Sequence, residues 1–252
     1  MQIYLDALRL PAVLTIVRHG ESAGNVARDA AMRAGAQRLD LRERDMDVPL
    51  SPLGEAQASA LGGWFRRERE WFDVVLASPY ERARGTADLI VAAGPVTPEF
   101  RTLTLDERLR EKEFGILDGL TRSGIEAEHY EQARLRTLLG KFYHRPPGGE
   151  SWCDVILRLR SMLDTISLHF AKKRVLIVTH QVVVLCLRYL LEGLNEQQIL
   201  AIDREGDIAN CAITQYRNDP EQGLALTRYN WAAPVAEKTP VTSAPDKKAA
   251  AP

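Results

Sequence analysis

Residues 13–20 have the sequence VLTIVRHG, a continuous apolar run followed by an arginine, a histidine and a glycine. Residues 175–180 (VLIVTH) repeat this arrangement after a charged stretch. Short β-branched runs that are apolar throughout, rather than alternating, are typical of strands covered on both faces of a parallel sheet. We therefore expect two buried strands, each ending at a histidine.

Helical segments alternate with strands along most of the chain. Ser51 and Pro52 predict a capped helix that continues to about Glu70, and residues 151–154 (SWCD) resemble a capping box before another helix. The other expected elements are strand 72–77, helices 80–93 and 182–193, and strands 209–216 and 224–229. This alternation predicts an α/β fold with three α/β/α layers and a mostly parallel central sheet.

The overall charge excludes several classes of function. The 252 residues carry 33 Lys and Arg against 34 Asp and Glu, a formal net charge of −1. No overall basic field for nucleic acid follows from this balance. No apolar run approaches the roughly 20 residues that cross a bilayer, and Asp6, Arg9 and Pro11 interrupt any signal-peptide core. We expect a cytoplasmic protein without nucleic acid or membrane partners; its oligomeric state stays open.

Cysteine and histidine spacing gives no indication of a metal centre. The cysteines are Cys153, Cys186 and Cys211. Three widely separated thiols predict neither a disulfide framework nor a zinc site. Three histidines, His129, His144 and His169, lack neighbours at metal-ligand spacing. We therefore expect no metal and no cofactor.

Two segments depart from the strand and helix alternation. Residues 26–48 contain five Arg and five acidic residues, and they predict a helix that turns into a charged loop. This segment could form a rim over the site, with arginines that hold a second anionic group, or a solvated surface excursion. Residues 232–252, rich in Ala, Pro and Lys, predict a disordered tail. One domain over residues 1–231 is the expected organisation.

The carboxyl ends of the two predicted strands carry the side chains with the clearest chemistry. Ligands of parallel sheets bind at this edge, next to helix N-termini. His19 and His180 would both lie there, with Arg18 beside His19 and Arg82 after another strand. Arginine and histidine with backbone amides and the amide of Asn25 suit a doubly charged anion such as phosphate.

The chain resembles the histidine phosphatase superfamily, which includes the cofactor-dependent phosphoglycerate mutases. The motifs, in the family's order, are RHGES (18–22) with Asn25, PLSPLG (49–54) with Gln57 and Ala58, SP (78–79) with Arg82, Thr86 and Ala87, LREKEFG (109–115), GES (149–151) and VTH (178–180). The resemblance extends over about residues 13–217. It implies a phosphoglycerate mutase-like fold and a small phosphorylated substrate.

The resemblance also implies roles for individual residues. His19 would be the nucleophile that becomes a phosphohistidine, and Glu111 the acid that protonates the leaving group. The residues that would hold the phosphoryl oxygens are Arg18, Asn25, Arg82 and His180. Ser22 and Gln181 are weaker candidates for substrate contact. Glu113 and Glu107 compete with Glu111 for the role of acid.

Some residues depart from the mutase pattern. Gln181 follows the second histidine where glycine is common, as in the fructose-2,6-bisphosphatase branch. Lys112, Glu113 and Phe114 differ from the arginine and aromatic pair that follow the acid in mutases. Both features favour phosphatase activity. Glu150 and Ser151 resemble the bisphosphatase branch too, although simple helix capping explains them equally well.

Other functions are compatible with parts of the sequence. Mutase-type phosphoryl transfer stays open, as does a protein that binds a phosphorylated partner without catalysis. Residues 20–24 (GESAG) also match the nucleophile elbow of serine hydrolases. That match is poor, because an elbow serine sits on the sharp turn where its strand ends, and Ser22 lies five residues after Val17.

Overall fold

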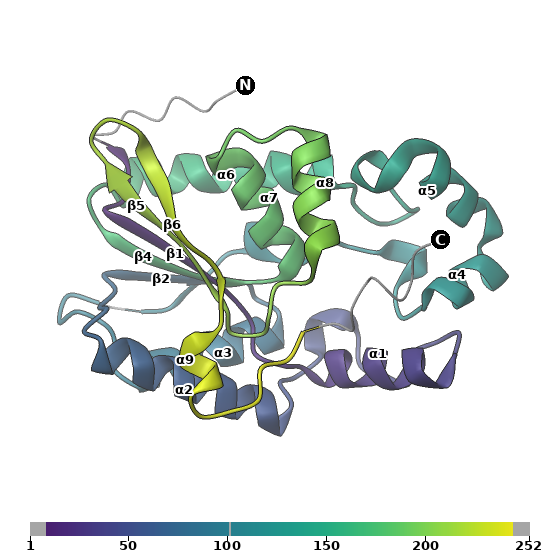
Figure 1. Cartoon of the computed structure of the whole chain (residues 1–252), viewed down its shortest axis with the longest axis horizontal. Helices are drawn as coiled ribbons and strands as arrows, with labels where there is room; N and C mark the ends of the chain where they lie inside the picture. Colours follow the sequence, from purple (N-terminus) through teal and green to yellow (C-terminus); the bar gives the residue numbers. More distant parts are fainter. Residues whose placement is uncertain (1–8, 101, 244–252) are drawn as a thin grey trace.

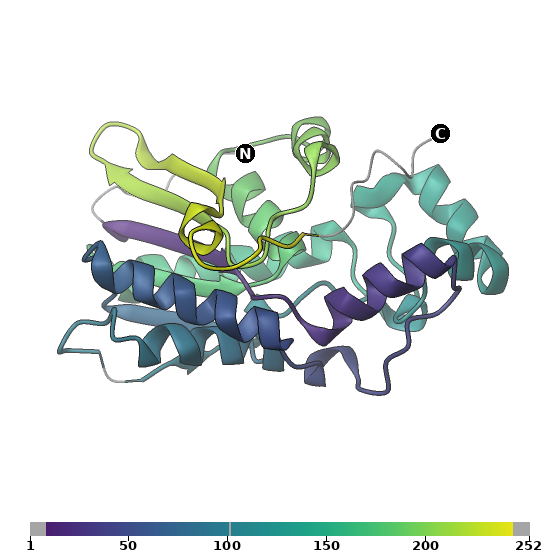
Figure 2. The same ribbon diagram turned by 60° about the horizontal axis from the view of Figure 1, so that its bottom comes forward.

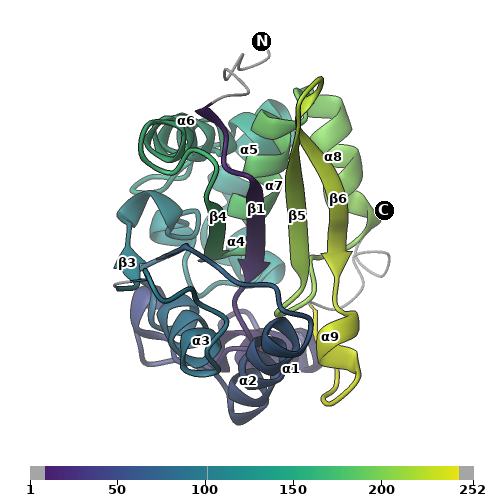
Figure 3. The same cartoon turned by 90° about the vertical axis from the view of Figure 1, so that its left-hand side faces the viewer.

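The computed structural model describes residues 9–100 and 102–243, which contain one mixed β-sheet with helices on both faces (Figure 1). The strands are β1 (Val13–Arg18), β2 (Val74–Ala77), β3 (Thr104–Leu105), β4 (Arg174–Thr179), β5 (Ile213–Asp219) and β6 (Gly223–Trp231). They lie in the order β3-β2-β4-β1-β5-β6, and Figure 3 shows β4, β1, β5 and β6 side by side. The first four strands in this order are parallel, whereas β5 is antiparallel to both β1 and β6.

Alternate residues of β4 face two separate apolar cores. The helices of the described chain are α1 (Ala23–Ala34), α2 (Pro52–Arg67), α3 (Glu81–Ala92), α4 (Arg122–Glu128), α5 (Tyr130–Tyr143), α6 (Trp152–His169), α7 (Gln181–Leu191), α8 (Glu196–Glu205) and α9 (Ala233–Ala236). Val175 and Ile177 pack in the core that α6 and α7 cover, and Leu176 and Val178 in the core under α2 and α3. This two-sided burial confirms the predicted three layers and explains the unbroken apolar run.

The predicted helix starts are present in the structure. The side chain of Ser51 accepts a hydrogen bond from the N–H of Gly54, and Pro52 is the first residue of α2. Ser151 and Asp154 form a reciprocal capping box at the start of α6. Each of these signals is local, because the cap satisfies N–H groups that the first helical turn leaves free.

Four helices have no counterpart in the sequence-based expectation: α4, α5, α8 and the short α9. Figure 1 shows α4 and α5 beyond the carboxyl ends of the central strands, next to α1. Exposed apolar residues in α5, among them Leu138 and Leu139, obscure its helical periodicity. None of the helices in the described residues is long and apolar enough to cross a membrane.

The charged segment 26–48 lies against the α4 region, and most of its side chains from residue 32 to residue 47 are exposed. Helix α1 ends at Gly35, whose φ of 63° is left-handed, and the chain then turns back. Leu39 donates a backbone hydrogen bond to the carbonyl of Gly119 at 2.9 Å, and Thr121 donates to that of Gln37 at 3.0 Å. Figure 2 shows α1 and this segment at the end of the molecule that also holds α4 and α5.

The structure differs from the expected disordered tail up to residue 243. Val235 of α9 is fully buried against the α2 and α3 side of the sheet. The side-chain amide of Gln57 donates to the carbonyl of Pro240 and to the hydroxyl of Thr242, both at 2.9 Å. Composition averaged over the tail conceals these few contacts, which give residues 232–243 a fixed path. Residues 244–252 lie outside the described part.

Candidate active site

The two strand-terminal histidines meet because β1 and β4 are adjacent, parallel and in register. Arg18 is paired with Thr179, and the N–H of His19 donates to the carbonyl of Thr179 at 2.8 Å. The rings of His19 and His180 lie edge to face, with centroids 5.1 Å apart. Both side chains are almost completely buried. The juxtaposition expected from the sequence is therefore a direct result of strand pairing.

The His19 ring is held with one nitrogen free. Its Nδ1 lies 2.7 Å from the carbonyl oxygen of Gly20, an acceptor, so Nδ1 carries the proton and Nε2 keeps its lone pair. Burial, with Arg82 and Arg18 nearby, moves the pKa of His19 well below its ordinary value. Because Gly20 packs against Gly54, a Cβ added at Gly20 would lie 2.5 Å from the Gly54 carbonyl oxygen. This tight turn fixes the position of the neutral imidazole ring.

His180 also has one nitrogen without a partner. Its Nε2 lies 2.8 Å from the hydroxyl of Ser78, and its Nδ1 is buried without a hydrogen bond to any described residue. Burial, followed by Arg82, moves the pKa of His180 well below its ordinary value. Since buried polar groups are normally hydrogen-bonded, this nitrogen beside His19 is available to a ligand.

Two further cations lie close to His19. Arg18 donates through Nη1 to the carbonyl of Ile208, while its Nε is buried without a partner among the described residues. Burial and the neighbouring Arg28 lower the pKa of Arg18 to about 10. Arg28, on α1, likewise has a buried Nε with no hydrogen bond to the described residues. Repulsion between these guanidinium groups would be relieved by a bound anion.

Arg82 approaches from α3 and is held by the charged segment. It donates to the carbonyl oxygen of Asp45 at 2.5 Å through Nη1 and to the carboxylate of Asp45 at 3.1 Å through Nη2. The guanidinium also lies 5.1 Å from the ring centroid of Tyr80. Asp45 therefore lies within the site, although nothing in the sequence distinguishes it from the other acidic residues of its segment.

Glu111 lies among the cations with its backbone neighbour as hydrogen-bond donor. Its carboxylate accepts a hydrogen bond from the N–H of Lys112 at 2.8 Å. Burial raises the pKa of Glu111, an effect that Arg82 and Arg18 oppose and Asp45 increases. A carboxyl group with a raised pKa keeps its proton to higher pH than an ordinary carboxyl group, and it can give up that proton during a reaction.

The competing carboxylates have structural partners. Glu113 accepts a hydrogen bond from the hydroxyl of Tyr80. Glu107 lies in the short 3-10 turn Glu107–Leu109, where its main-chain carbonyl, not its carboxylate, accepts from Arg110. Glu150 accepts from Arg110 at 2.7 Å and from Arg158 at 3.0 Å, so it is the centre of an ion-pair network. The contacts of Glu113 and Glu150 favour Glu111 over these two as the carboxyl group free to act on a ligand.

Asn25 and Ser22 form the N-terminal cap of α1. The N–H and hydroxyl of Ser22 donate to Oδ1 of Asn25 at 3.0 and 3.1 Å, and the N–H of Asn25 donates back to the Ser22 hydroxyl. Asn210 donates to the carbonyl of His19 at 3.0 Å and lies 3.4 Å from Oδ1 of Asn25. Capping accounts for the buried Ser22 hydroxyl, and Asn25 is placed beside the His19 loop.

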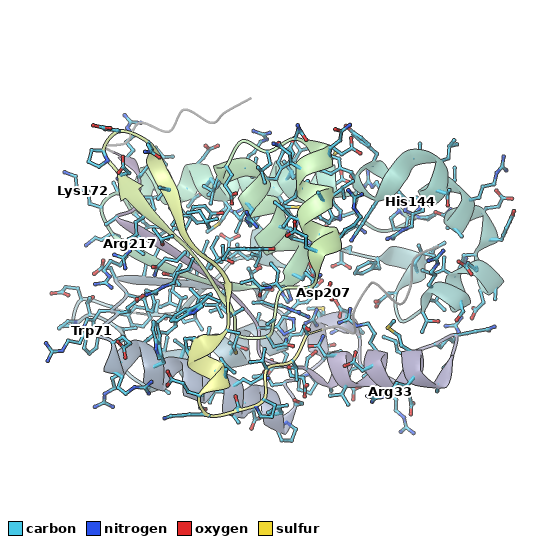
Figure 4. All side chains as sticks on the ribbon, viewed as in Figure 1. Arg33, Trp71, His144, Lys172, Asp207 and Arg217 are labelled. Atoms are coloured by element: carbon cyan, nitrogen blue, oxygen red, sulfur yellow. The ribbon has the colours of Figure 1, made fainter. Side chains whose placement is uncertain are left out.

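Gln181 is linked through Asp207 to the surroundings of Arg18. Its side-chain amide donates to a carboxylate oxygen of Asp207 at 2.7 Å, and Asp207 raises the pKa of Arg18 against the effect of burial. Figure 4 shows Asp207 near the middle of the molecule, between α8 and α1, whereas His144 lies away from it near α5. Gln181 thus belongs to the surroundings of Arg18.

Several residues at the site could not be identified as site residues from the sequence, or only by a weak pattern. Ser78 is one whose signal was available, because the serine before Pro79 ends a predicted strand. Tyr80, Asp45, Asp207 and Asn210 come from loops and turns that only the tertiary structure brings together. In the described residues, no group of three or more His, Cys, Asp or Glu side chains has the arrangement of a metal site.

The parallel sheet with two histidines and converging arginines defines a protein that handles phosphoryl groups. A model of the histidine phosphatase superfamily (branch 1) matches residues 14–232, and the chain belongs to that superfamily. The chain is 31% identical over 191 residues to a 2,3-bisphosphoglycerate-dependent phosphoglycerate mutase of Methylobacterium radiotolerans, covering 74% of this chain and 82% of the mutase.

Two further comparisons bear on the same family. A 6-phosphofructo-2-kinase/fructose-2,6-bisphosphatase of Caenorhabditis elegans is 32% identical over 177 residues, or 70% of this chain and 33% of that protein. The chain spans about half, or less, of the length of some curated relatives. A mycobacterial glucosyl-3-phosphoglycerate phosphatase, solved with inorganic phosphate, superposes with a TM-score of 0.66 at 25% identity, covering 88% of this chain and 99% of that one. Phosphatases and mutases among these proteins support a phosphoryl-handling enzyme.

Proposed function

We propose that the chain is a metal-independent phosphomonoesterase that hydrolyses a small phosphorylated metabolite through a phosphohistidine on His19. The observation that carries this proposal is the state of the His19 ring. Its Nδ1 is fixed by the Gly20 carbonyl, and its pKa is lowered, so Nε2 is a neutral nucleophile next to Arg18. Neutral imidazole beside positioned cations suits attack on a phosphoryl group.

In the first step, Nε2 of His19 attacks phosphorus and the bond between phosphorus and the leaving oxygen breaks. Glu111 gives its proton to that oxygen, so the product leaves as an alcohol. Arg18, Arg82 and the free nitrogen of His180 would stabilise the negative charge on the non-bridging oxygens. The buried Nε of Arg18 and Nδ1 of His180, which have no hydrogen-bond partner among the described residues, support this assignment.

In the second step, water attacks the phosphohistidine and the bond between phosphorus and Nε2 breaks. Glu111, now ionised, accepts a proton from the water. Inorganic phosphate leaves, and His19 returns to its neutral form. The raised pKa of Glu111 supports both roles, because the group must be protonated in one step and ionised in the next.

Mutase activity is the second candidate, because the bacterial relative named above is a phosphoglycerate mutase. The residues after Glu111 favour hydrolysis. Lys112 is buried, its Nζ lies 4.5 Å from the ring centroid of Phe114, and Glu113 is bonded to Tyr80. These side chains are occupied by internal contacts in the stretch where mutases carry an arginine and an aromatic pair.

Hydrolysis of p-nitrophenyl phosphate by the wild type and by His19→Asn tests the proposal, with His169→Asn as a control at an exposed histidine. We expect turnover by wild type and control, and none by His19→Asn. Brief incubation with labelled substrate should give an acid-labile phosphate on His19. An acid-stable phosphoserine, or phosphate binding without turnover, would contradict the proposal.

The two catalytic activities are separated by product analysis. The enzyme is incubated with 3-phosphoglycerate and a trace of 2,3-bisphosphoglycerate, and phosphorus NMR follows both products. Inorganic phosphate without 2-phosphoglycerate is the outcome expected of a phosphatase. A panel of phosphorylated sugars, glycerates and nucleotides, compared by initial rates, would then identify the substrate class.

A further inference from the structure

Asp45 lies in a short 3-10 turn, Asp45–Asp47, at the end of the charged segment. Its carboxylate contacts both terminal nitrogens of Arg82, with Nη1 to Oδ1 and Nη2 to Oδ2 each at 3.1 Å. The main-chain carbonyl of Asp45 accepts a third contact from Nη1 at 2.5 Å. The Arg82 side chain is 7% exposed, whereas that of Asp45 is 36% exposed. A carboxylate on the rim thus binds a buried arginine.

These contacts with Asp45 occupy one edge of the Arg82 guanidinium and leave a second edge without a partner among the described residues. A guanidinium is a planar fork of N–H donors, with one edge formed by the two terminal nitrogens and another by Nε and Nη2. Asp45 occupies the terminal edge. Nε makes no hydrogen bond to the described residues, so the edge of Nε and Nη2 is available to a bidentate oxygen ligand.

Rotation of Arg82 is restricted on two sides. Tyr80 lies beneath the guanidinium, and Tyr80 also contacts the ring of His180, with centroids 5.2 Å apart. Asp45 fixes the remaining degree of freedom by bonding the end of the fork. Arginine side chains otherwise retain several rotamers, and a misplaced charge stabilises a transition state poorly.

We propose that Asp45 is a positioning residue that holds the end of Arg82 so that its Nε and Nη2 edge faces the phosphoryl group on His19. The inference rests on the proposed function, since it assigns Arg82 to the phosphoryl group. It also gives the charged segment a role in the site, because the segment that packs on α4 brings one carboxylate to Arg82. Asp47, in the same turn, instead pairs with the exposed Arg44.

A second effect of the Asp45 charge follows from its position. Three charged side chains act on the Glu111 carboxyl group: Arg82 on α3, Arg18 on β1 and Asp45 in the charged segment. The N–H of Lys112 also donates to this carboxylate. Arg82 and Arg18 lower the pKa of Glu111, and without the negative charge of Asp45 this lowering is opposed less strongly. The pKa of Glu111 then falls, so the carboxyl group loses its proton, and with it its function as the acid, at a lower pH.

The experiment compares the wild type with Asp45→Asn, Asp45→Glu and the matched control Asp47→Asn. For each, kcat/KM is measured across pH, and binding of inorganic phosphate is measured by calorimetric titration. Asp45→Asn should lower kcat/KM by about tenfold or more, weaken phosphate binding, and move the basic limb of the kcat/KM profile to lower pH. Asp45→Glu should restore the position of that limb, and Asp47→Asn should match the wild type.

Each result decides the inference. Tighter phosphate binding by Asp45→Asn would overturn it and identify Asp45 as a competitor for the anion site. Unchanged phosphate binding and an unchanged pH profile would also overturn it. If the wild type binds phosphate but hydrolyses no ester, the proposed function fails, while weaker phosphate binding by Asp45→Asn still supports the positioning of Arg82.

Discussion

The hydroxyl of Ser78 lies 2.8 Å from Nε2 of His180, and this contact leaves Nδ1 as the free nitrogen of the ring. Ser78 follows β2, whereas His180 follows β4, and the two strands are neighbours in the sheet. The orientation of the second histidine therefore depends on a hydroxyl from a different strand. Ser78, which has no proposed contact with a phosphoryl oxygen, can in this way orient His180, which has one.

Ser78→Ala is predicted to reduce kcat/KM about tenfold, because the His180 ring loses its orienting hydrogen bond. Loss of one hydrogen bond should lower the free energy of unfolding by only about 1 kcal/mol. Steady-state kinetics and urea denaturation measure the two effects. Ser123→Ala, at an exposed serine, is the control. A kinetic loss no larger than that of the control would contradict the orienting role.

Glu111→Gln is predicted to lower kcat for an alkyl phosphate by about 100-fold or more, because the leaving alkoxide loses its proton donor. The loss should be much smaller with p-nitrophenyl phosphate, whose leaving group needs no proton. Glu113→Gln, which keeps an oxygen to accept from Tyr80, should show no such dependence on the leaving group. If Glu113→Gln has the larger, leaving-group-dependent effect, Glu113 is the acid.

The two buried histidines predict how stability depends on pH. Their pKa values in the folded state are below the value near 6.5 of the unfolded chain, so the unfolded chain binds more protons in acid. The two histidines therefore make their full contribution to the free energy of unfolding above about pH 6.5, and that contribution is lost as the pH falls below this value. The raised pKa of Glu111 acts in the opposite direction, lowering stability as the pH rises above about 4.5.

The free energy of unfolding is measured by urea denaturation at pH 7.5 and at pH 5.5. Its decrease from pH 7.5 to pH 5.5 should be larger in the wild type than in His19→Asn. Each histidine contributes at most about 1.4 kcal/mol per pH unit. The variant lacks one of these groups, so its stability should change less over the same interval. An identical change in both proteins would show that His19 is not held neutral by the fold.

Activity is predicted to survive excess EDTA, because the proposed mechanism stabilises charge with Arg18, Arg82 and His180. Initial rates with and without chelator, after dialysis, give the measurement. Re-addition of Mg²⁺ or Zn²⁺ is the control for metal dependence. A loss of activity that either ion restores would refute the metal-free mechanism.

Val235→Ala tests the ordered path of residues 232–243. Val235 is fully buried against the core under α2 and α3, so its truncation should lower the free energy of unfolding by about 1–3 kcal/mol. Val241→Ala, at an exposed valine nearby, should have little effect. Equal stability of both variants and the wild type would restore the disordered tail expected from composition.

The features that could be predicted from the sequence are those determined by short stretches of chain. Apolar runs of strand length predicted β1 and β4, and their shared direction placed His19 beside His180. Ser51 and Ser151 predicted helix starts, since a cap involves only the first helical turn. Loops and turns separated in sequence could not be placed in this way: the contact between Asp45 and Arg82 joins residues that no periodicity connects.

Regions with weak or mixed patterns were predicted least well. Helix α5 exposes Leu138, so its apolar positions do not follow a simple amphipathic repeat. The last described residues are held by a few contacts, such as those of Gln57, that composition does not reveal. Tertiary contacts in both cases outweigh the local preference of the chain.

A chain of hydrogen bonds connects the end of the described protein with the proposed nucleophile. Thr242 donates to Oδ1 of Asn210 at 3.1 Å, and Nδ2 of Asn210 donates to the carbonyl of His19 at 3.0 Å. Truncation of the chain before Thr242 would therefore remove the first hydrogen bond of a connection that reaches the backbone of His19. The point at which the chain is shortened is thus an experimental variable in any assay of this protein.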